Sequence, residues 1–237
     1  GTNMNLSIQS GVREVKQNLH PHVGKIGVAL SKGLLMGARG NSGVILSQLF
    51  RGFSKNIENK ETLNAQEFAE ALNAGVQTAY KAVMKPVEGT ILTVAREAAL
   101  KALETAQKTQ DITEVMRETV KEAKAALKRT PELLPVLKEV GVVDSGGQGL
   151  VFVYEGFLAQ LEGKPLGEGE VKEVSLEQLV EQEHHKSAQS FLSTEDIVYG
   201  YCTEFMVKLA EEKLKNNPFS ETKFRNDLSR FGNSLLV

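Results

Sequence analysis

Residues 91–106 read Ile-Leu-Thr-Val-Ala-Arg-Glu-Ala-Ala-Leu-Lys-Ala-Leu-Glu-Thr-Ala. Apolar residues recur every three or four positions along this stretch, which is the spacing of one face of an α-helix. Alanine, leucine, lysine and glutamate also have high helix propensity. The stretch therefore predicts a long amphipathic helix, and the segments on either side of it carry the same pattern.

Helical spacing recurs through the first two thirds of the chain, and no stretch there has the alternation typical of a strand. The other predicted helices cover residues 3–18, 23–36, 44–53, 66–84, 113–128, 133–140 and 150–161. Eight helical segments without a strand predict an all-α domain over residues 1–162.

The composition changes after this domain. Glycine, proline, lysine and acidic residues between Gly163 and Glu173 are typical of a linker, and we assign residues 163–190 to it. A strand is predicted over 195–208, a helix capped by a serine over 220–231, and a second strand over 234–237. Residues 191–237 are therefore expected to begin an α/β or α+β domain. The missing initial methionine and the apolar last residues suggest a piece of a longer protein.

The amino-acid composition gives no sign of a nucleic-acid-binding, membrane-spanning or disulfide-bonded protein. The 237 residues are 41% hydrophobic and 24% charged with a net charge of −2, as in ordinary globular proteins. No stretch concentrates lysine and arginine without acidic residues, so nucleic-acid binding is not indicated. No run approaches the roughly 20 apolar residues of a membrane helix. The single Cys202 excludes an internal disulfide and fits a cytoplasmic protein.

Four predicted helices begin after loops that combine glycine with Asn, Ser, Thr or Asp. The loops are Gly1-Thr2-Asn3, Gly40-Asn41-Ser42-Gly43, Glu88-Gly89-Thr90 and Asp144-Ser145-Gly146-Gly147. The first turn of a helix has unpaired N–H groups and a partial positive charge, and glycine lets a ligand approach the backbone. Several such N-termini at one end of a bundle would bind phosphate without any lysine.

Ordinary helix capping explains any one of these loops, whereas four in one domain favour a binding site. Neither a P-loop nor a dinucleotide fingerprint is present. We predict that Asn3, Ser42, Thr90 and Asp144 line a single hollow.

Other polar residues are weighed against plain structural roles. Cys202 is interpreted as a buried small hydrophobe rather than a metal ligand or nucleophile. His184 and His185 are interpreted as solvated surface, and His20 and His22 as loop-capping residues. Arg39, inside the glycine-rich turn, fits surface pairing and phosphate contact equally well.

Three runs, in this order and at this spacing, resemble a known family: Gly-Ala-Arg-Gly-Asn-Ser-Gly-Val-Ile (37–45), Lys-Pro-Val-Glu-Gly-Thr-Ile-Leu-Thr-Val (85–94) and Gly-Val-Val-Asp-Ser-Gly-Gly-Gln-Gly (141–149). They resemble the L-type nucleotide-binding domain of dihydroxyacetone kinases and, more closely, the A subunit of fatty acid kinase. Residues 199–205 resemble the middle domain of the same fatty acid kinase component.

The resemblance implies an antiparallel eight-helix barrel that binds ATP with Mg²⁺ in a cup at one end. It implies phosphoryl transfer to a fatty acid carboxylate held by a separate DegV-like fatty-acid-binding protein, and it is compatible with a homodimer of the full-length protein. The nucleotide-binding positions that it implies are Gly1, Thr2, Asn3, Asn41, Ser42, Gly43, Gly89, Thr90, Arg129, Asp144, Ser145 and Gly146.

In the family, the aspartates that bind magnesium lie just before the position of Gly1. No metal ligand is therefore assigned in this chain, and little kinase activity is expected of these 237 residues alone. Two alternatives stay open: a non-catalytic nucleotide-binding or partner-docking domain of the same fold, and a kinase of the dihydroxyacetone type.

Overall fold

The structure is a computed structural model, which describes residues 1–164 and, further on, 203, 205, 207, 209–216, 218–232 and 235–236. Residues 1–164 contain eight helices and no strand. The helices are α1 (Thr2–Gln17), α2 (Val23–Met36), α3 (Gly40–Ile57), α4 (Ala65–Ala82), α5 (Ile91–Ala106), α6 (Ile112–Leu133), α7 (Pro135–Val140) and α8 (Ser145–Leu161). The predicted all-α domain is thus confirmed.

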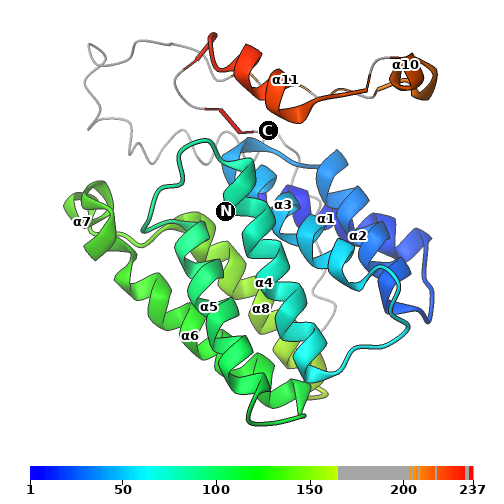
Figure 1. The fold of residues 1–237 in the computed structure, drawn as a ribbon. Coiled ribbons are helices and arrows are strands. Elements are labelled where there is room, and N and C mark those ends of the chain that lie inside the picture. The colour runs from blue at the N-terminus through cyan, green and yellow to red at the C-terminus, as the bar shows by residue number, and fades with distance from the viewer. Residues whose placement is uncertain are drawn as a thin grey trace.

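The long helices pack side by side in one bundle (Figure 1). Consecutive helices contact each other from α1 to α6, and α8 returns to contact α6, α5 and α1. The short α7 contributes no buried residue and contacts α6. Seven helices therefore form the body of the bundle, and α7 lies at its edge.

Helix α5 has the most heavily buried sequence of the bundle. Its alanines Ala95, Ala98, Ala99 and Ala102 are all at most 1% exposed, and α4, α6 and α8 pack around it. Small side chains let neighbouring helices approach closely, and larger residues such as Leu46, Met116 and Leu150 fill the spaces between them. The apolar spacing that predicted this helix is therefore the pattern of a core element.

Side-chain caps set several helix starts. Asn64 accepts a hydrogen bond from the Glu67 N–H while the Glu67 carboxylate accepts one from the Asn64 N–H, which is a complete capping box for α4. Asp111 and Asp144 cap α6 and α8 through one side-chain oxygen each.

Several predicted helix boundaries were wrong. Helix α3 runs from Gly40 to Ile57 rather than over 44–53, with Arg39 at its N-cap, and α8 begins at Ser145 rather than Leu150. The glycine-rich turns are therefore the first turns of these helices.

Helix α6 runs through Pro131, where the sequence predicted an end. Proline removes the N–H that would bond to the Leu127 carbonyl. The Thr130 hydroxyl donates to that carbonyl instead, at 2.7 Å, so the helix continues.

The described part of the C-terminal region holds two further helices, α10 (Glu211–Asn216) and α11 (Glu221–Leu228). Ser220 caps α11, which confirms the predicted helix and its serine cap. Of the predicted strand over 234–237, the described residues show a single bridge between Leu236 and Val83 of the α4–α5 loop. Arg225 also donates to the Ala82 carbonyl at 2.8 Å, so this region contacts the end of α4.

Some predictions fall on residues outside the described set. They include residues 165–190 of the predicted linker, most of the predicted strand 195–208, and the side chains of Cys202, His184 and His185. The predicted α/β or α+β character of residues 191–237 depends largely on these residues as well. Among the described histidines, His20 accepts a hydrogen bond from the His22 N–H, as expected of a loop-capping residue.

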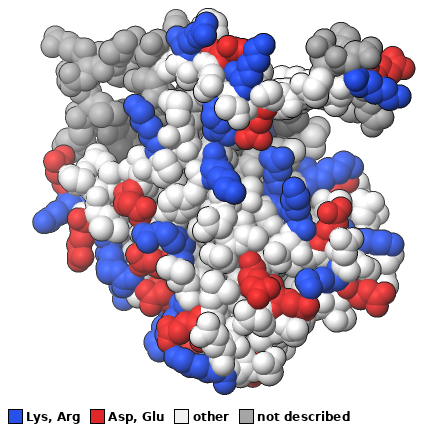
Figure 2. Space-filling view, in the orientation of Figure 1, with Lys and Arg blue, Asp and Glu red and all other residues white. Residues whose placement is uncertain are grey.

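The surface carries both signs of charge. On the face in view in Figure 2, lysine and arginine are interspersed with aspartate and glutamate over the bundle. Within the described residues, no helix is both long and apolar enough to span a bilayer.

Candidate nucleotide-binding site

The direction of the helices brings four N-termini to one end of the bundle. Short connections join successive contacting helices, so neighbours run antiparallel, and α1, α3 and α5 begin at the same end. The short α7 lies between α6 and α8, and α8 therefore also begins there. These are the four helices whose starts carry glycine with short polar residues.

Contacts around Gly146 show that three of these N-termini meet. A Cβ placed on Gly146 would lie 3.2 Å from Ser42 Oγ and 3.2 Å from Asp144 Oδ2. The same position is 3.4 Å from Ile91 Cβ, the residue after Thr90. The starts of α3, α5 and α8 are thus separated by about the width of one methyl group, and a larger residue at 146 would fill that space.

The start of α1 lies beside the start of α3. A Cβ on Gly40 would lie 2.2 Å from Asn3 Nδ2, and one on Gly43 would lie 3.6 Å from the Asn3 carbonyl oxygen. Residues 3, 42, 90 and 144 therefore lie around one end of the bundle. Their role toward a nucleotide stays a prediction.

The first turns present several amides to this region. Asn41 and Ser42 in α3, and Ser145 and Gly146 in α8, have no carbonyl four residues earlier within their helix. The helix dipole adds partial positive charge at the same place, so an anion is stabilised there. Asn41 and Ser145 are exposed and Ser42 is half-buried, so this end of the bundle is open to solvent.

Asp144 joins the starts of α5 and α8. Its carboxylate accepts the Gly147 N–H at 2.6 Å and also a hydrogen bond from the Ile91 N–H. Burial raises the pKa of Asp144, although these two N–H groups act in the opposite direction. The carboxylate thus holds two helix N-termini together.

Three buried hydroxyl groups, which the sequence analysis missed, hold the loops in place. The Ser7 hydroxyl accepts the Arg39 N–H at 3.3 Å, the Thr93 hydroxyl accepts the Gly89 N–H at 2.8 Å, and the Thr130 hydroxyl accepts the Asp144 N–H at 3.1 Å. All three side chains are fully buried. A polar residue at a core position of an amphipathic helix was the signal that could have found them.

The chain matches two known protein families. Residues 1–159 match the family described as the DAK2 domain, and residues 198–237 match the middle domain of proteins similar to the A subunit of fatty acid kinase. The chain belongs to the DAK2 domain family. Its second match makes it similar to the fatty acid kinase component that the three sequence runs predicted.

Proteins from several bacteria are similar to this chain over its whole length. Protein YloV of Bacillus subtilis is 65% identical over all 237 residues, an uncharacterized protein of Staphylococcus haemolyticus is 58% identical, and one of Staphylococcus saprophyticus is 57% identical. The chain covers 42% of the length of each of these relatives.

Two arginines that the sequence placed near the site of the DAK2 domain have protein partners. The exposed Arg129 pairs with Glu97 of α5 and, at 2.7 Å, with Glu122 of α6, so its guanidinium is engaged on the outside of the bundle. Arg39 donates to the neighbouring Ala38 carbonyl at 2.7 Å. Each guanidinium therefore has a partner within the protein, and a contact of either one with nucleotide stays a prediction.

The described residues fit a phosphate better than a metal ion. The first-turn amides of α3 and α8 are donors that suit an anion. No group of three or more His, Cys, Asp or Glu side chains in the described residues could hold a cation. The binding of an anion at the starts of α1, α3, α5 and α8 stays a prediction.

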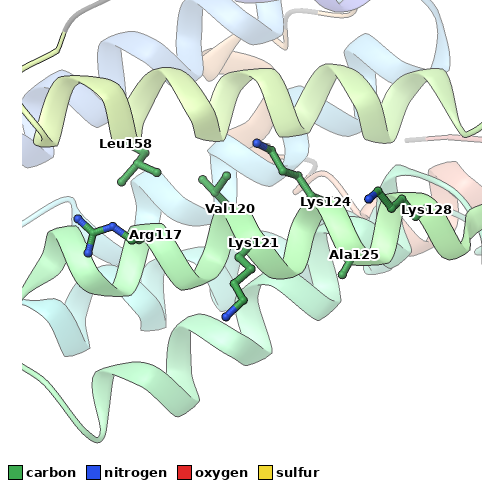
Figure 3. A pocket seen from close by; sticks show the side chains of 7 residues that line it. All are labelled: Arg117, Val120, Lys121, Lys124, Ala125, Lys128 and Leu158. Carbon is green, nitrogen blue, oxygen red and sulfur yellow. The ribbon is translucent and has the colours of Figure 1, made fainter.

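A groove of about 500 Å³ lies elsewhere in the DAK2 domain, along the flanks of α6 and α8 (Figure 3). Its floor is apolar, with Val120, Ala125 and Leu158, and cationic side chains of α6 line its edges. Lys121 and Lys124 are paired with Glu118 and Glu155. No residue that lines the groove lies in the first turn of a helix. The groove therefore lacks the first-turn amides that are found at the starts of α3, α5 and α8.

Proposed function

We propose that this chain is the nucleotide-binding part of an ATP-dependent kinase that phosphorylates a fatty acid carboxylate. The acyl group would be presented by a separate DegV-like fatty-acid-binding protein, and the product would be an acyl phosphate. The observation that supports the nucleotide site best is the meeting of the α3, α5 and α8 N-termini around Gly146. Membership of the DAK2 family and the match to the fatty acid kinase middle domain support the acceptor class.

Each group at the site has a role in this proposal. The first-turn amides of Asn41, Ser42 and Gly146 bind phosphate oxygens, and the Ser42 hydroxyl adds a short donor. Asp144 keeps the starts of α5 and α8 at a fixed separation through its two N–H bonds. Such fixed donors stabilise charge on a transferring phosphoryl group without reorganising.

Magnesium is proposed as the partner of the triphosphate. Bound Mg²⁺ neutralises phosphate charge during phosphoryl transfer. The described residues contain no set of ligands for it, so we assign it none. The contribution of this chain is to bind and orient the nucleotide.

Acyl phosphate formation by the full-length protein, at the length of its relatives, tests this function. ATP consumption should require Mg²⁺, a DegV-like partner and its bound fatty acid together, and omission of any one should reduce turnover to background. Turnover with dihydroxyacetone and none with the fatty acid would favour the dihydroxyacetone kinase alternative. Mg-ATP binding without turnover under any of these conditions would favour the non-catalytic alternative.

A further inference from the structure

The carboxylate of Glu88 is the centre of a hydrogen-bonded network just before Gly89 and Thr90. Tyr80 of α4 donates its hydroxyl proton to Oε1 at 3.0 Å. Thr93 and Arg96 of α5 donate to Oε2 at 2.7 and 2.8 Å. Arg96 Nε also donates to the Tyr80 hydroxyl at 3.2 Å, which closes the network between the two helices.

The network reaches the backbone of the site through Thr93. A threonine hydroxyl has one proton, and here that proton is donated to Glu88. The lone pairs of the same oxygen are therefore directed at the Gly89 N–H, which donates to it at 2.8 Å. Thr93 is fully buried, so its hydroxyl is shielded from water, whereas the side chain of Glu88 is 47% exposed. The carboxylate of Glu88 thus orients the group that holds Gly89.

Gly89 has little freedom to move once this bond forms. Its φ of 80° lies in the left-handed region, and a Cβ there would lie 2.8 Å from Leu134 Cβ and 2.9 Å from the Thr130 carbonyl oxygen. Thr90 follows directly as the N-cap of α5 and accepts the Leu92 N–H. The position of Gly89 therefore fixes the start of α5 next to Gly146.

Glu88 is ionised at neutral pH. Burial raises the pKa of its carboxyl, but the hydrogen bonds from Thr93 and Tyr80 and the charge of Arg96 outweigh that effect and lower the pKa overall. Bonds to an ionised acceptor are stronger than neutral ones. Glu88 therefore attaches the exposed segment at Val87 to α4 and α5 through an ionised carboxylate with three side-chain donors.

We propose that Glu88 is a positioning residue for nucleotide binding, acting through Thr93 on Gly89 and the N-terminus of α5. This rests on the proposed nucleotide site. It adds that the position of the loop depends on an ionic network between α4 and α5, outside the groups that contact phosphate. Loss of the network would leave the helices folded and the loop misplaced.

Glu88→Gln in the full-length protein tests this, because glutamine keeps the size of the side chain and removes the charge. We expect amide exchange at Gly89 to become at least tenfold faster and the Kd for Mg-ATP to rise about tenfold. The matched control is Glu155→Gln, which breaks the ion pair with Lys124 in the middle of α8. The control should change neither quantity, and both variants should have similar melting temperatures.

Thr93→Val and Thr93→Ser separate orientation from general stability. Thr93→Val should reproduce the effect of Glu88→Gln on Gly89, and the double variant should add little to either single one, because both act through one bond. Thr93→Ser keeps the hydroxyl and should restore slow exchange at Gly89. If Glu88→Gln does not fold, Tyr80→Phe removes one donor to the same carboxylate and should give a smaller change of the same sign.

Wild-type exchange at Gly89 and wild-type Mg-ATP affinity in Glu88→Gln would overturn the inference. Failure of the unsubstituted protein to bind Mg-ATP would contradict the proposed function instead. In that case Gly89 exchange alone decides the positioning role of Glu88: faster exchange supports it and unchanged exchange overturns it.

Discussion

Single residues at the starts of α3, α5 and α8 have a structural role and a proposed ligand-binding role, and substitution of Gly146 can separate the two. Alanine is favoured over glycine inside a helix by about 1 kcal/mol. At Gly146 the added Cβ would also lie 3.2 Å from Ser42 Oγ and Asp144 Oδ2, which is a tight but adjustable contact. The methyl group would occupy the space where a phosphate oxygen is expected.

We therefore predict that Gly146→Ala changes the free energy of unfolding by less than about 1 kcal/mol but raises the Kd for Mg-ATP at least tenfold. Urea denaturation and calorimetric titration of the full-length protein measure the two effects. Gly156→Ala is the matched control, because it lies in the same helix and its Cβ would meet nothing within 4 Å. Equal affinities in the two variants would argue against phosphate binding at Gly146.

Thr130 makes two hydrogen bonds that nothing else in its surroundings replaces. Its hydroxyl donates to the Leu127 carbonyl that Pro131 leaves without a partner, and it accepts the Asp144 N–H. Thr130→Val would leave both backbone groups unpaired in a buried site, which costs about 1–3 kcal/mol for each group.

We predict that Thr130→Val lowers the free energy of unfolding by at least about 2 kcal/mol. Thr119→Val should cost clearly less, because its hydroxyl bonds to the Val115 carbonyl, which already accepts a helical N–H. Both side chains are fully buried in α6, so the comparison isolates the missing backbone partner. Urea unfolding followed by circular dichroism measures both, and equal losses would refute this account of Pro131.

At the scale of the element, periodicity predicted which segments are helices better than where they begin. The interior of α5 was predicted to the residue because every turn of it repeats the same apolar spacing. The starts of α3 and α8 were placed too late because glycine is a weak helix former in isolation. Partners distant in sequence, such as Ser42 beside Gly146, determine these turns, and local spacing contains no information on them.

The capping box of α4 gives this helix a pH-dependent start. Hydrogen bonding from Lys60 and from the Asn64 N–H lowers the pKa of Glu67 below its ordinary value of 4.5. A carboxyl whose pKa is lower in the folded state stabilises that state above the unfolded pKa, and the contribution is lost as the pH falls through the folded pKa. Acidification below about pH 4.5 should therefore loosen the N-terminus of α4.

Amide exchange between pH 6 and pH 3, corrected for intrinsic rates, checks this at Glu67 and Phe68. Protection there should decrease as Glu67 is protonated, while protection in the middle of α5 persists. In Glu67→Gln the capping geometry is retained without the titration, so protection should no longer depend on pH over this range. A wild-type pH dependence in that variant would assign the effect to another group.

At the scale of the whole molecule, the antiparallel order of the helices brings the predicted site residues together. Alternating directions bring the N-termini of α1, α3, α5 and α8 to one end, although these starts are spread from Thr2 to Ser145 along the chain. The sequence predicted this meeting of the four loops from their shared composition and from the resemblance to nucleotide-binding kinases. It did not predict the three buried hydroxyls, because their role depends on which loop passes each one.

The C-terminal region contacts the same loop that Glu88 anchors. Leu236 bridges Val83, the Leu235 carbonyl accepts the Met84 N–H at 3.3 Å, and Arg225 bonds to the Ala82 carbonyl. One end of the α4–α5 loop therefore lies against this region, and its other end begins α5 at the site. The α4–α5 loop thus contacts the described C-terminal residues at one end and begins α5, near the predicted site, at the other.

Amide exchange of the full-length protein with and without Mg-ATP tests the central claim most directly. We predict that the nucleotide slows exchange most at residues 41–43, 90–92 and 145–147, which are the first turns of α3, α5 and α8. Protection confined to the groove between α6 and α8, or no protection anywhere in the bundle, would contradict the account.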